Sequence, residues 1–337
     1  MSAPAIEIDH VDLEIGAFAL SDISLSVASS EILMLLGRNG AGKSVLLETI
    51  AGFHIPAAGR IRVGGRDVTR LPPERRRVGF MVQNFGLFPH MSVADNIRFA
   101  LRARGDGARD SVGALLERFQ LSPLAARLPD GLSPGEKQRV ALARALASRP
   151  DAFLFDEPFA ALDTRTRDSL RDELSGFLRE TGRGAIVVTH DEDDVHALAD
   201  RVAVIHAGVL QQVGTVEDVF ARPANLIVAD CAGVENLISG PTAERLLAGA
   251  SNKTLCLRAE HIDVCPAGPH PREANGAIWL DAVVSEIVRL GPVARVTLDC
   301  GFPLVAMLPK RQAQGLTRGG PALARIASER VHVVGEG

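Results

Sequence analysis

The sequence contains few aromatic residues and few cysteines. Its 337 residues include 13 Phe, one Trp (Trp279) and no Tyr, so few side chains are available to stack on a base. The four cysteines, Cys231, Cys256, Cys265 and Cys300, form no C-x-x-C pair. Their spacing argues against a zinc site or a disulfide framework and favours a reduced, cytoplasmic protein.

Long apolar runs and a strong charge imbalance are also missing. The longest apolar runs, such as 32–36 and 185–188, have the size of strands and fall well short of the roughly 20 residues that span a bilayer. No charged-then-apolar leader opens the chain, so we expect no secretory signal. Lys and Arg number 37 and Asp and Glu 41, and the net charge of −4 argues against a basic nucleic-acid-binding protein.

Seven arginines lie between residues 60 and 77. They could form a nucleic-acid patch, but no aromatic residues are interleaved with them as in surfaces that bind single strands. We therefore expect this segment to be a solvated surface loop.

The chain is long enough for two domains, and the pattern of apolar and polar residues changes near residue 233. Before that point, short apolar runs alternate with helical patterns, which is typical of a mostly parallel sheet covered by helices. The predicted strands are 31–36, 78–82, 152–155, 185–189 and 202–205, and the predicted helices are 43–51, 136–147, 166–180 and 192–199. The later part predicts short strands at 254–258, 277–284, 293–298, 304–308 and 330–334. We expect an α/β domain over 1–232 and a small all-β domain over 233–337.

A glycine-rich segment between a predicted strand and a predicted helix is suited to binding phosphate. It fits the pattern G-x-x-x-x-G-K-[ST] and reads Gly37-Arg38-Asn39-Gly40-Ala41-Gly42-Lys43-Ser44. Glycines let backbone N–H groups turn toward phosphate oxygens, and the helix N-terminus adds a positive field. Lys43 would reach the β- and γ-phosphates and Ser44 would bind Mg²⁺. The alternative, a glycine-rich turn without a ligand, is weaker because both flanking elements are predicted.

Two carboxylates follow the apolar run 152–155. Asp156 ends that predicted strand, where a phosphate-loop enzyme needs an acidic partner for Mg²⁺. The adjacent Glu157 could orient and deprotonate an attacking water. A strand-end turn would explain Asp156 alone, but it does not explain the pair downstream of Lys43.

Four further motifs lie around these two in a fixed order. They are Gln83, the segment Leu132-Ser133-Pro134-Gly135-Glu136-Lys137-Gln138-Arg139, the segment Ala161-Leu162-Asp163, and the segment Val188-Thr189-His190-Asp191. Together with the phosphate loop they resemble the ATP-binding cassette (ABC) ATPases over roughly residues 5–230. The resemblance implies a P-loop NTPase fold with a helical subdomain at about 88–150.

The resemblance also implies a role for each matching residue. The implied catalytic residues are Glu157, His190 and Lys43, with His190 as the switch histidine. The implied ATP-binding residues are Gly37, Arg38, Asn39, Gly40, Ala41, Gly42, Lys43, Ser44, Val45 and Gln83. The implied ligands of Mg²⁺, which would be bound together with ATP, are Ser44, Gln83 and Asp156. In a homodimer, the γ-phosphate held by one subunit would be faced by the other subunit's signature residues, Ser133, Pro134, Gly135 and Glu136. Asp163 would lie at the interface between the two subunits.

The sequence departs from the family pattern at two places. The usual signature L-S-G-G-Q has Pro134 and Glu136 here. Ser133 and Glu136 predict a capping box with proline at the first helical position, so the helix end should survive with one phosphate-facing donor fewer. The position where relatives stack an aromatic on adenine is Ile15, with Phe18 three residues on, so the residue that contacts adenine stays open.

The C-terminal segment resembles the OB-like (TOBE) regulatory domains of importer ATPases. The segments that carry this resemblance are 258–262, 290–292 and 295–301, and segments 233–238, 299–311 and 322–334 are most similar to the molybdate/tungstate importers. The resemblance implies a peripheral subunit on the cytoplasmic face of the bacterial inner membrane, a separate membrane permease that contacts 85–90, and a periplasmic or extracellular substrate-binding protein. Packing of 85–90 within this chain alone is the alternative.

The cargo and the class of protein have alternatives. Sulfate, iron(III), polyamine and sugar importers stay open. A Lys-Ala-Ser-Ser stretch that senses oxyanion in some relatives is replaced by Ala327-Ser328-Glu329-Arg330, where Glu329 would repel an anion unless Arg330 or Arg295 compensates. A soluble cassette ATPase outside transport, acting on ribosomes or nucleic acid, and a cassette that no longer hydrolyses ATP are the competing classes. The acidic net charge and the absence of a second cassette argue against the first, and the presence of Glu157 and His190 argues against the second.

Overall fold

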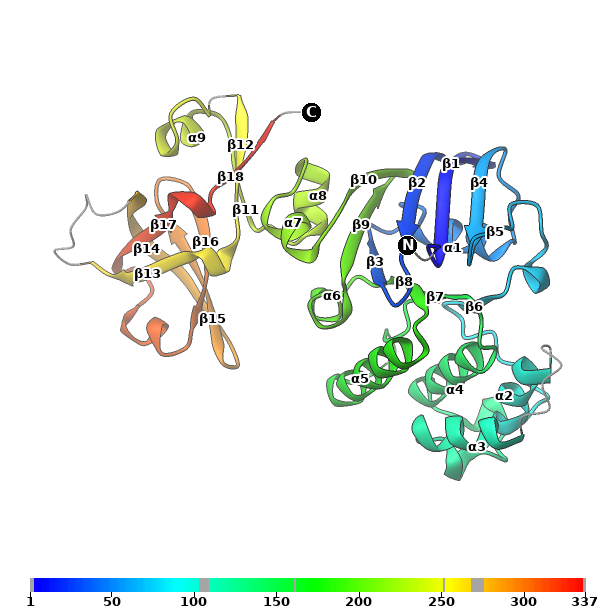
Figure 1. Ribbon diagram of the computed structural model, residues 1–337. Helices are drawn as coiled ribbons and strands as arrows, with labels where there is room; N and C mark the ends of the chain where they lie inside the picture. The colour runs from blue at the N-terminus through cyan, green and yellow to red at the C-terminus, as the bar shows by residue number, and fades with distance from the viewer. Residues whose placement is uncertain (1–2, 103–108, 161, 251, 268–275, 336–337) are drawn as a thin grey trace. The chain divides into compact units, whose positions relative to one another are not determined.

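The structure, a computed structural model, describes residues 3–102, 109–160, 162–250, 252–267 and 276–335 (Figure 1). The chain divides into two compact units, Met1–Val216 and Glu217–Gly337. Each unit is built around its own hydrophobic core. Among the described residues, no helix combines the length and the apolar character needed to cross a membrane.

A six-stranded sheet with the order β10-β9-β3-β8-β7-β6 forms the centre of unit 1. Its strands are β3 (Ile32–Leu36), β6 (Val78–Met81), β7 (Ala152–Asp156), β8 (Gly184–Val188), β9 (Arg201–His206) and β10 (Val209–Gly214). All neighbours are parallel except β9 and β10. Every residue of β3, β7 and β8 is buried, which explains why these strands have continuous apolar runs. The predicted parallel α/β sheet is confirmed.

A second, antiparallel sheet in unit 1 was not predicted. Its order is β2-β1-β4-β5, with β1 (Ile6–Ile15), β2 (Phe18–Val27), β4 (Ala58–Val63) and β5 (Arg66–Asp67). Alternating apolar residues mark β1 and β2, but register shifts in their pairing interrupt the alternation. Helix α1 (Lys43–Ala51) shares one core with strands of both sheets through Leu46, Leu47 and Ile50.

The remaining helices of unit 1 are α2 (Val93–Arg102), α3 (Arg109–Arg118), α4 (Pro134–Ala147), α5 (Thr164–Thr181) and α6 (Glu192–Leu198). Short 3₁₀ turns lie at Pro73–Arg75, Ser122–Leu124 and Pro129–Gly131. In Figure 1, α2, α3 and α4 lie together at one end of the unit, within the segment 88–150 that the sequence assigns to a helical subdomain.

The expected solvated surface loop at residues 60–77 is only partly present: five of the seven arginines are exposed, but the segment is not a loop throughout. Much of the segment lies in β4, β5 and a 3₁₀ turn, and Arg76 is fully buried. Its guanidinium donates hydrogen bonds to the carbonyl oxygens of Thr49 (2.8 Å) and Ile50 (3.0 Å), in the last turn of α1. It also donates to the carbonyls of Leu71 (2.7 Å) and Thr69 (2.9 Å). A buried cation satisfied by carbonyl oxygens cannot be distinguished from a surface arginine by composition alone.

Unit 2 consists mainly of two antiparallel sheets, with the orders β11-β12-β18 and β13-β17-β14-β15-β16. Its strands are β11 (Asn236–Ile238), β12 (Lys253–Leu257), β13 (Ile262–Pro266), β14 (Ala277–Leu290), β15 (Val293–Asp299), β16 (Pro303–Pro309), β17 (Pro321–Ala327) and β18 (His332–Gly335). Its helices are α7 (Val216–Ala221, which begins at the last residue of unit 1), α8 (Leu226–Cys231) and α9 (Gly240–Leu246), with 3₁₀ turns at Ala259–His261, Gln312–Gly315 and Ser328–Arg330. The predicted all-β, OB-like character of the C-terminal part is confirmed.

The division between the units falls earlier in the chain than the sequence predicts, after Val216 rather than after residue 232. The intervening helices α7 and α8 contact the β-strands that follow them. His332 Nε2 lies 2.9 Å from the carbonyl oxygen of Pro223, and Arg258 covers the ring of Phe220 at 5.4 Å. Ala229 packs in a cluster with Cys256 and Val334. Such long-range contacts have no local signal in the sequence.

Candidate nucleotide-binding site

The phosphate loop connects the end of β3 to the first residue of α1. Gly40 and Gly42 have positive φ angles of 79° and 108°, which favour glycine. Lys43 begins the helix, and its side chain turns back over the loop. Its Nζ donates to the carbonyl oxygens of Gly37 (2.7 Å) and Arg38 (3.2 Å). The loop therefore holds a mostly buried ammonium group beside a helix N-terminus, an arrangement that attracts phosphate.

Asp156 ends β7 and lies in the buried part of the site. Its side chain is only 5% exposed, and it accepts a hydrogen bond from the side chain of Ser44. Burial raises the pKa of the Asp156 carboxyl, and the neighbouring Glu157 adds to the rise. The hydrogen bond from Ser44 and the charge of Lys43 act in the opposite direction.

Parallel pairing of β7 with β8 brings Glu157 and His190 together. Asp156 pairs with Val188, so the residues that follow both strands meet at the same sheet edge. The N–H of Glu157 donates to the Val188 carbonyl oxygen (3.1 Å), and His190 Nδ1 lies 3.5 Å from Glu157 Oε1. Glu157 has a φ of 52°, a left-handed backbone conformation that is uncommon for this residue type.

These groups open into one cavity of about 730 Å³. The lining residues are Phe18, Asn39, Gly40, Gly42, Lys43, Ser44, Val45, Gln83, Asp156, Glu157 and His190. The volume lies within the range of about 300–1,000 Å³ that is usual for small-molecule sites. One ammonium group and two carboxylates line the cavity, and these are the charges that a phosphate ester with a divalent cation needs.

The predicted site residues occupy three kinds of position in the structure: within the phosphate loop but outside the cavity, on the cavity wall, and at the starts of α4 and α5. Gly37, Arg38 and Ala41 shape the phosphate loop without lining the cavity, and the other predicted ATP-binding, metal-binding and catalytic residues line it. The predicted signature residues 133–136 and Asp163 do not line it. They begin α4 and α5 instead, and Ala161, which precedes Asp163 by two residues, lies outside the described part of the chain.

The predicted capping box is present at the start of α4. Ser133 Oγ accepts from the N–H of Glu136 (3.3 Å), and Glu136 Oε2 accepts from the N–H of Ser133 (2.7 Å). Pro134 occupies the first helical position, as expected. The hydrogen bonds from Ser133 lower the pKa of the Glu136 carboxyl, so this helix end carries a negative side chain near neutral pH. Asp163 is the N-cap of α5 and accepts from the N–H of Thr166 (3.1 Å).

Two residues near the cavity had no assigned role at the level of sequence. Gln138 is fully buried, and its Nε2 donates to the carbonyl oxygen of Glu157 (3.1 Å), which fixes the strained backbone there. Phe18 lies against the phosphate loop, since a Cβ added to Gly42 would stand 2.5 Å from its ring. Ile15, where the family pattern has its aromatic, is 37% exposed and does not line the cavity. Only the fold identifies Gln138, whereas Phe18 could be noticed in the sequence because it lies three residues after Ile15.

Divalent magnesium fits the donor set in this cavity. A carboxylate, a hydroxyl and an amide oxygen are available from Asp156, Ser44 and Gln83, and Mg²⁺ prefers oxygen ligands. The buried Asp156 carboxylate lies beside Glu157, and this unfavourable pairing would be relieved by a cation.

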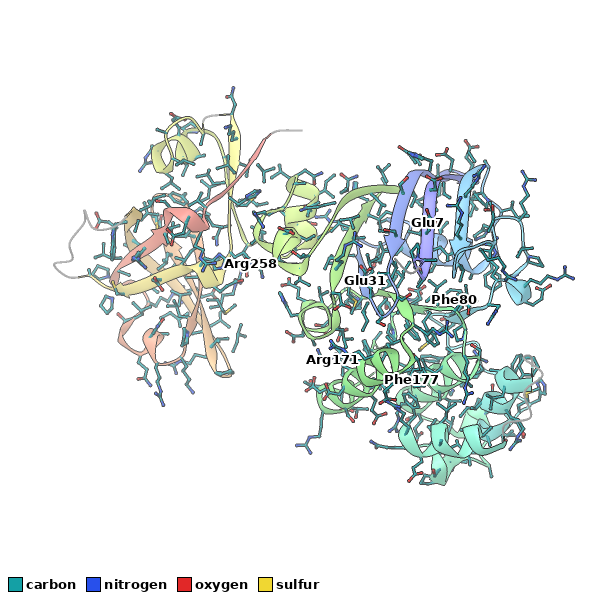
Figure 2. All side chains as sticks on the ribbon, viewed as in Figure 1. Glu7, Glu31, Phe80, Arg171, Phe177 and Arg258 are labelled. Carbon is teal, nitrogen blue, oxygen red and sulfur yellow. The ribbon has the colours of Figure 1, made fainter. Side chains whose placement is uncertain are left out.

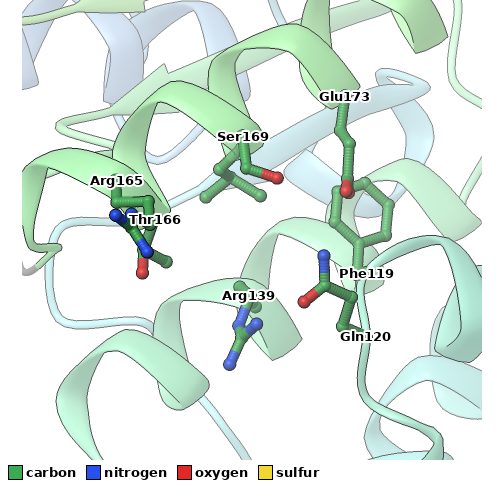
Figure 3. A pocket seen from close by; sticks show the side chains of 8 residues that line it. Phe119, Gln120, Arg139, Arg165, Thr166, Ser169 and Glu173 are labelled. Atoms are coloured by element: carbon green, nitrogen blue, oxygen red, sulfur yellow. The ribbon is translucent and has the colours of Figure 1, made fainter.

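A second hollow of about 270 Å³ lies between α4 and α5 (Figure 3). Arg139 of α4, Gln120, and Arg165 and Glu173 of α5 contribute polar groups to its wall. None of the predicted nucleotide-binding residues lines it, so we assign it no part in the nucleotide site.

Comparisons with known proteins agree with this geometry. A family model described as ABC transporter matches residues 20–160. The spermidine/putrescine import ATP-binding protein of Roseobacter denitrificans is 46% identical over 237 residues, covering 69% of this chain and 65% of that protein. The sulfate/thiosulfate import ATP-binding protein of Chromobacterium violaceum is 40% identical over 300 residues, covering 84% of this chain and 81% of that protein.

The similarity to a further relative extends over nearly the whole chain, and a solved dimer is also similar. The molybdate/tungstate import ATP-binding protein of Pyrococcus horikoshii is 35% identical over 345 residues, covering 97% of this chain and 99% of that protein. The dimeric post-hydrolysis structure of an ATP-binding cassette bound to ADP and phosphate aligns with a TM-score of 0.57 and 27% identity, covering 62% of this chain and 98% of that chain.

Proposed function

The chain belongs to the ABC transporter family, and on that premise we propose that it is the ATP-hydrolysing subunit of a binding-protein-dependent importer. The observation that carries the proposal is the single cavity in which Lys43, Asp156, Glu157 and His190 meet. A lysine at a helix N-terminus, two carboxylates and an imidazole are the groups that hydrolysis of a nucleoside triphosphate requires.

The phosphate loop binds the nucleotide in this proposal. Backbone N–H groups of Gly40 and Gly42 and the ammonium of Lys43 hold the β- and γ-phosphates. On binding, Lys43 exchanges its contacts with the Gly37 and Arg38 carbonyls for phosphate oxygens. Phe18, at the cavity wall, packs against the nucleoside. Ser44, Gln83 and Asp156 would hold Mg²⁺, which when bound would supply positive charge beside the phosphate oxygens.

Hydrolysis uses the pair at the ends of β7 and β8. Glu157 orients a water molecule and accepts its proton as the water oxygen bonds to the γ-phosphorus. The bond between that phosphorus and the bridging oxygen breaks, and ADP leaves with the bridging oxygen. His190 donates a hydrogen bond to the γ-phosphate and keeps the water in line. The 3.5 Å separation of His190 Nδ1 from Glu157 Oε1 lets both groups act on one water.

The active form in this proposal is a head-to-tail homodimer. Residues 133–136 and Asp163 lie outside the cavity of their own subunit, which agrees with a role in the partner's site. The capped N-terminus of α4 offers N–H groups to the partner's γ-phosphate, and Pro134 removes one of them. ATP then joins two incomplete half-sites, and hydrolysis separates them. The solved cassette with 27% identity is itself a dimer.

A docking surface for the permease is proposed at residues 85–90. Arg144 fixes the loop by donating to the carbonyl oxygens of Gly86 (2.6 Å) and Phe85 (2.8 Å), and it stacks over Phe88 at 5.5 Å. The Phe88 ring packs on Phe99 (4.6 Å between centroids), which remains 47% exposed. A half-buried aromatic residue on a fixed loop beside an exposed one on α2 suits a partner helix. A permease here would hold the subunit at the cytoplasmic face of the inner membrane, with a substrate-binding protein on the other side.

Molybdate or tungstate is the proposed cargo. Support comes from a molybdate/tungstate relative that matches 97% of this chain, including unit 2, and from the similarity of segments 233–238, 299–311 and 322–334 to the molybdate/tungstate importers. A polyamine importer subunit of Pseudomonas aeruginosa matches 99% of this chain at the same identity of 35%, so polyamine is the second candidate. Titration calorimetry of the full chain with molybdate, tungstate, sulfate and spermidine tests the choice. A heat of binding seen only with molybdate or tungstate supports the assignment. A heat of binding seen only with spermidine or sulfate overturns it.

ATP turnover by the purified chain tests the proposed activity. We expect the rate per subunit to rise with protein concentration, because each site needs two subunits. Glu157→Gln should lower the rate by at least about 100-fold while stabilising an ATP-dependent dimer in size-exclusion chromatography with light scattering. Glu74→Gln, at an exposed position in a 3₁₀ turn, is the matched control and should behave like the wild type. Full turnover by a monomer would contradict the dimer, and full turnover by Glu157→Gln would contradict the assigned base.

A further inference from the structure

A network of charged side chains ties the loop that carries His190 to helix α5. The loop runs from Thr189 to the first turn of α6, and two arginines one turn apart on α5, Arg167 and Arg171, reach it. Figure 2 labels Arg171 on α5. The proposed roles of Glu157 and His190 make no use of these arginines, so their burial and pairing call for a separate explanation.

The first link joins Arg167 to Asp191, the residue after the switch histidine. The Arg167 guanidinium donates to Asp191 Oδ2, and both side chains are about three-quarters covered, with 24% and 27% exposed. The other carboxylate oxygen, Oδ1, accepts from the N–H of Asp193 (2.9 Å) and so caps α6. Asp191 is therefore held from two directions, by α5 on one side and by α6 on the other.

The second link joins Arg171 to the residue before the switch histidine. Arg171 NH1 lies 3.5 Å from Asp194 Oδ1, and the same guanidinium donates to Asp168. Asp194 Oδ2 accepts from the hydroxyl of Thr189 (2.9 Å), and that hydroxyl accepts from the N–H of Asp191 (3.1 Å). Arg171, Asp194 and Thr189 are all buried.

The links lie beside the proposed catalytic pair. Glu157, Thr189 and His190 line, together with Arg167 and Asp194, one small cavity of about 10 Å³. Both neighbours of His190 in the chain are thus anchored to α5, while the His190 imidazole itself is 69% exposed and faces Glu157. Contacts with Arg167 and Arg171 therefore restrain the backbone on each side of the histidine.

We propose that Arg167 and Arg171 are positioning residues for hydrolysis, which hold residues 189–194 so that His190 stays within reach of Glu157. The inference rests on the proposed function, because it assumes that this pair acts on ATP. The arginines lie on α5 and do not line the nucleotide cavity, whereas the phosphate loop belongs to β3 and α1. Loss of an arginine should therefore slow the chemical step and leave nucleotide binding intact.

Steady-state ATPase kinetics of Arg167 variants test the proposal. A displacement of about 1 Å of a catalytic group can lower a rate by about 100-fold. We expect Arg167→Gln to lower kcat by at least about tenfold with an unchanged KM for ATP. Arg167→Lys keeps a cation that can reach Asp191 and should recover part of the rate. Arg179→Gln makes the same substitution at an exposed position in the last turn of α5 and should retain the wild-type kcat.

A second variant approaches the same link from the other side. Asp191→Asn keeps a good N-cap for α6 but removes the charge that pairs with Arg167. It should also lower kcat at constant KM. Because both changes break one interaction, the double variant Arg167→Gln/Asp191→Asn should be no slower than the slower single variant.

The outcomes separate this inference from the proposed function. A wild-type kcat in Arg167→Gln would overturn the inference while leaving the ATPase assignment intact. Equal losses in the Gln and Lys variants, accompanied by a lower melting temperature, would make Arg167 merely structural and would also overturn it. Absence of turnover in the wild-type chain would instead refute the proposed function, on which the inference depends.

Discussion

Replacement of the buried Arg76 by methionine should destabilise unit 1 by about 4 kcal/mol. The magnitude follows from the contacts. The guanidinium donates four hydrogen bonds to buried carbonyl oxygens, and each is worth about 1 kcal/mol net. Methionine fills much of the same volume but offers the Thr49 and Ile50 carbonyls no donor.

The loss of stability should be greatest around α1, which carries part of the nucleotide site, because two of the four carbonyls belong to the last turn of this helix. The positive charge of Arg76 also complements the negative end of that helix dipole. Helix α1 begins at Lys43, so a frayed C-terminal turn would loosen the helix that carries the phosphate-binding lysine. We therefore expect a higher KM for ATP in addition to the lower stability.

Urea denaturation with two optical probes measures the effect. Circular dichroism at 222 nm follows the helices, most of which lie in unit 1, whereas fluorescence of Trp279, the only tryptophan, follows unit 2. Arg76→Met should shift the dichroism midpoint strongly and the fluorescence midpoint much less. Arg75→Met, one residue earlier and exposed, should change the stability by less than about 0.5 kcal/mol. A dichroism midpoint of Arg76→Met equal to that of Arg75→Met would refute the reasoning.

Two further predictions concern the nucleotide cavity. Asp156→Asn should raise the melting temperature of the nucleotide-free protein at pH 7, since burial raises the pKa of this carboxyl and the folded state therefore disfavours its ionised form. In the wild type, the ionised Asp156 carboxylate destabilises the fold once the pH rises above the carboxyl's ordinary pKa of 3.8, so the gain in melting temperature should vanish below that pH. ATP hydrolysis by Asp156→Asn should be lost at every pH. Phe18→Ala should raise the KM for ATP by about tenfold with little change in kcat, because stacking of an aromatic ring on a base contributes about 1–3 kcal/mol. An unchanged KM would show that Phe18 does not contact the nucleoside.

Motifs whose parts are adjacent in the chain could be predicted well. The phosphate loop, the run that ends in Asp156 and the capping box of Ser133 and Glu136 each depend on neighbouring residues, and the structure has the loop, strand end and helix start where the sequence predicts them. The continuous apolar runs of β3, β7 and β8 likewise identify buried parallel strands.

The antiparallel sheet of β1, β2, β4 and β5 could not be predicted as reliably, because its signal is weaker. Alternation along β1 is broken between Ile8 and Val11, where the register with β2 shifts. The burial of Arg76 has no local signal at all, because the carbonyls that satisfy it come from α1 and from residues 69 and 71. The position of Phe18 beside the phosphate loop also depends on packing between segments far apart in the chain.

Residue type and spacing alone specify a phosphate loop, two adjacent carboxylates after an apolar strand, and a histidine after another strand. Which of these groups meet depends on the tertiary fold. Parallel register between β7 and β8 brings His190 to Glu157, and arginines of α5 hold the loop between Thr189 and Asp194. The physical reason is range: backbone propensity and capping act over a few residues, whereas hydrogen bonds and ion pairs between distant segments form only once the fold has brought them together.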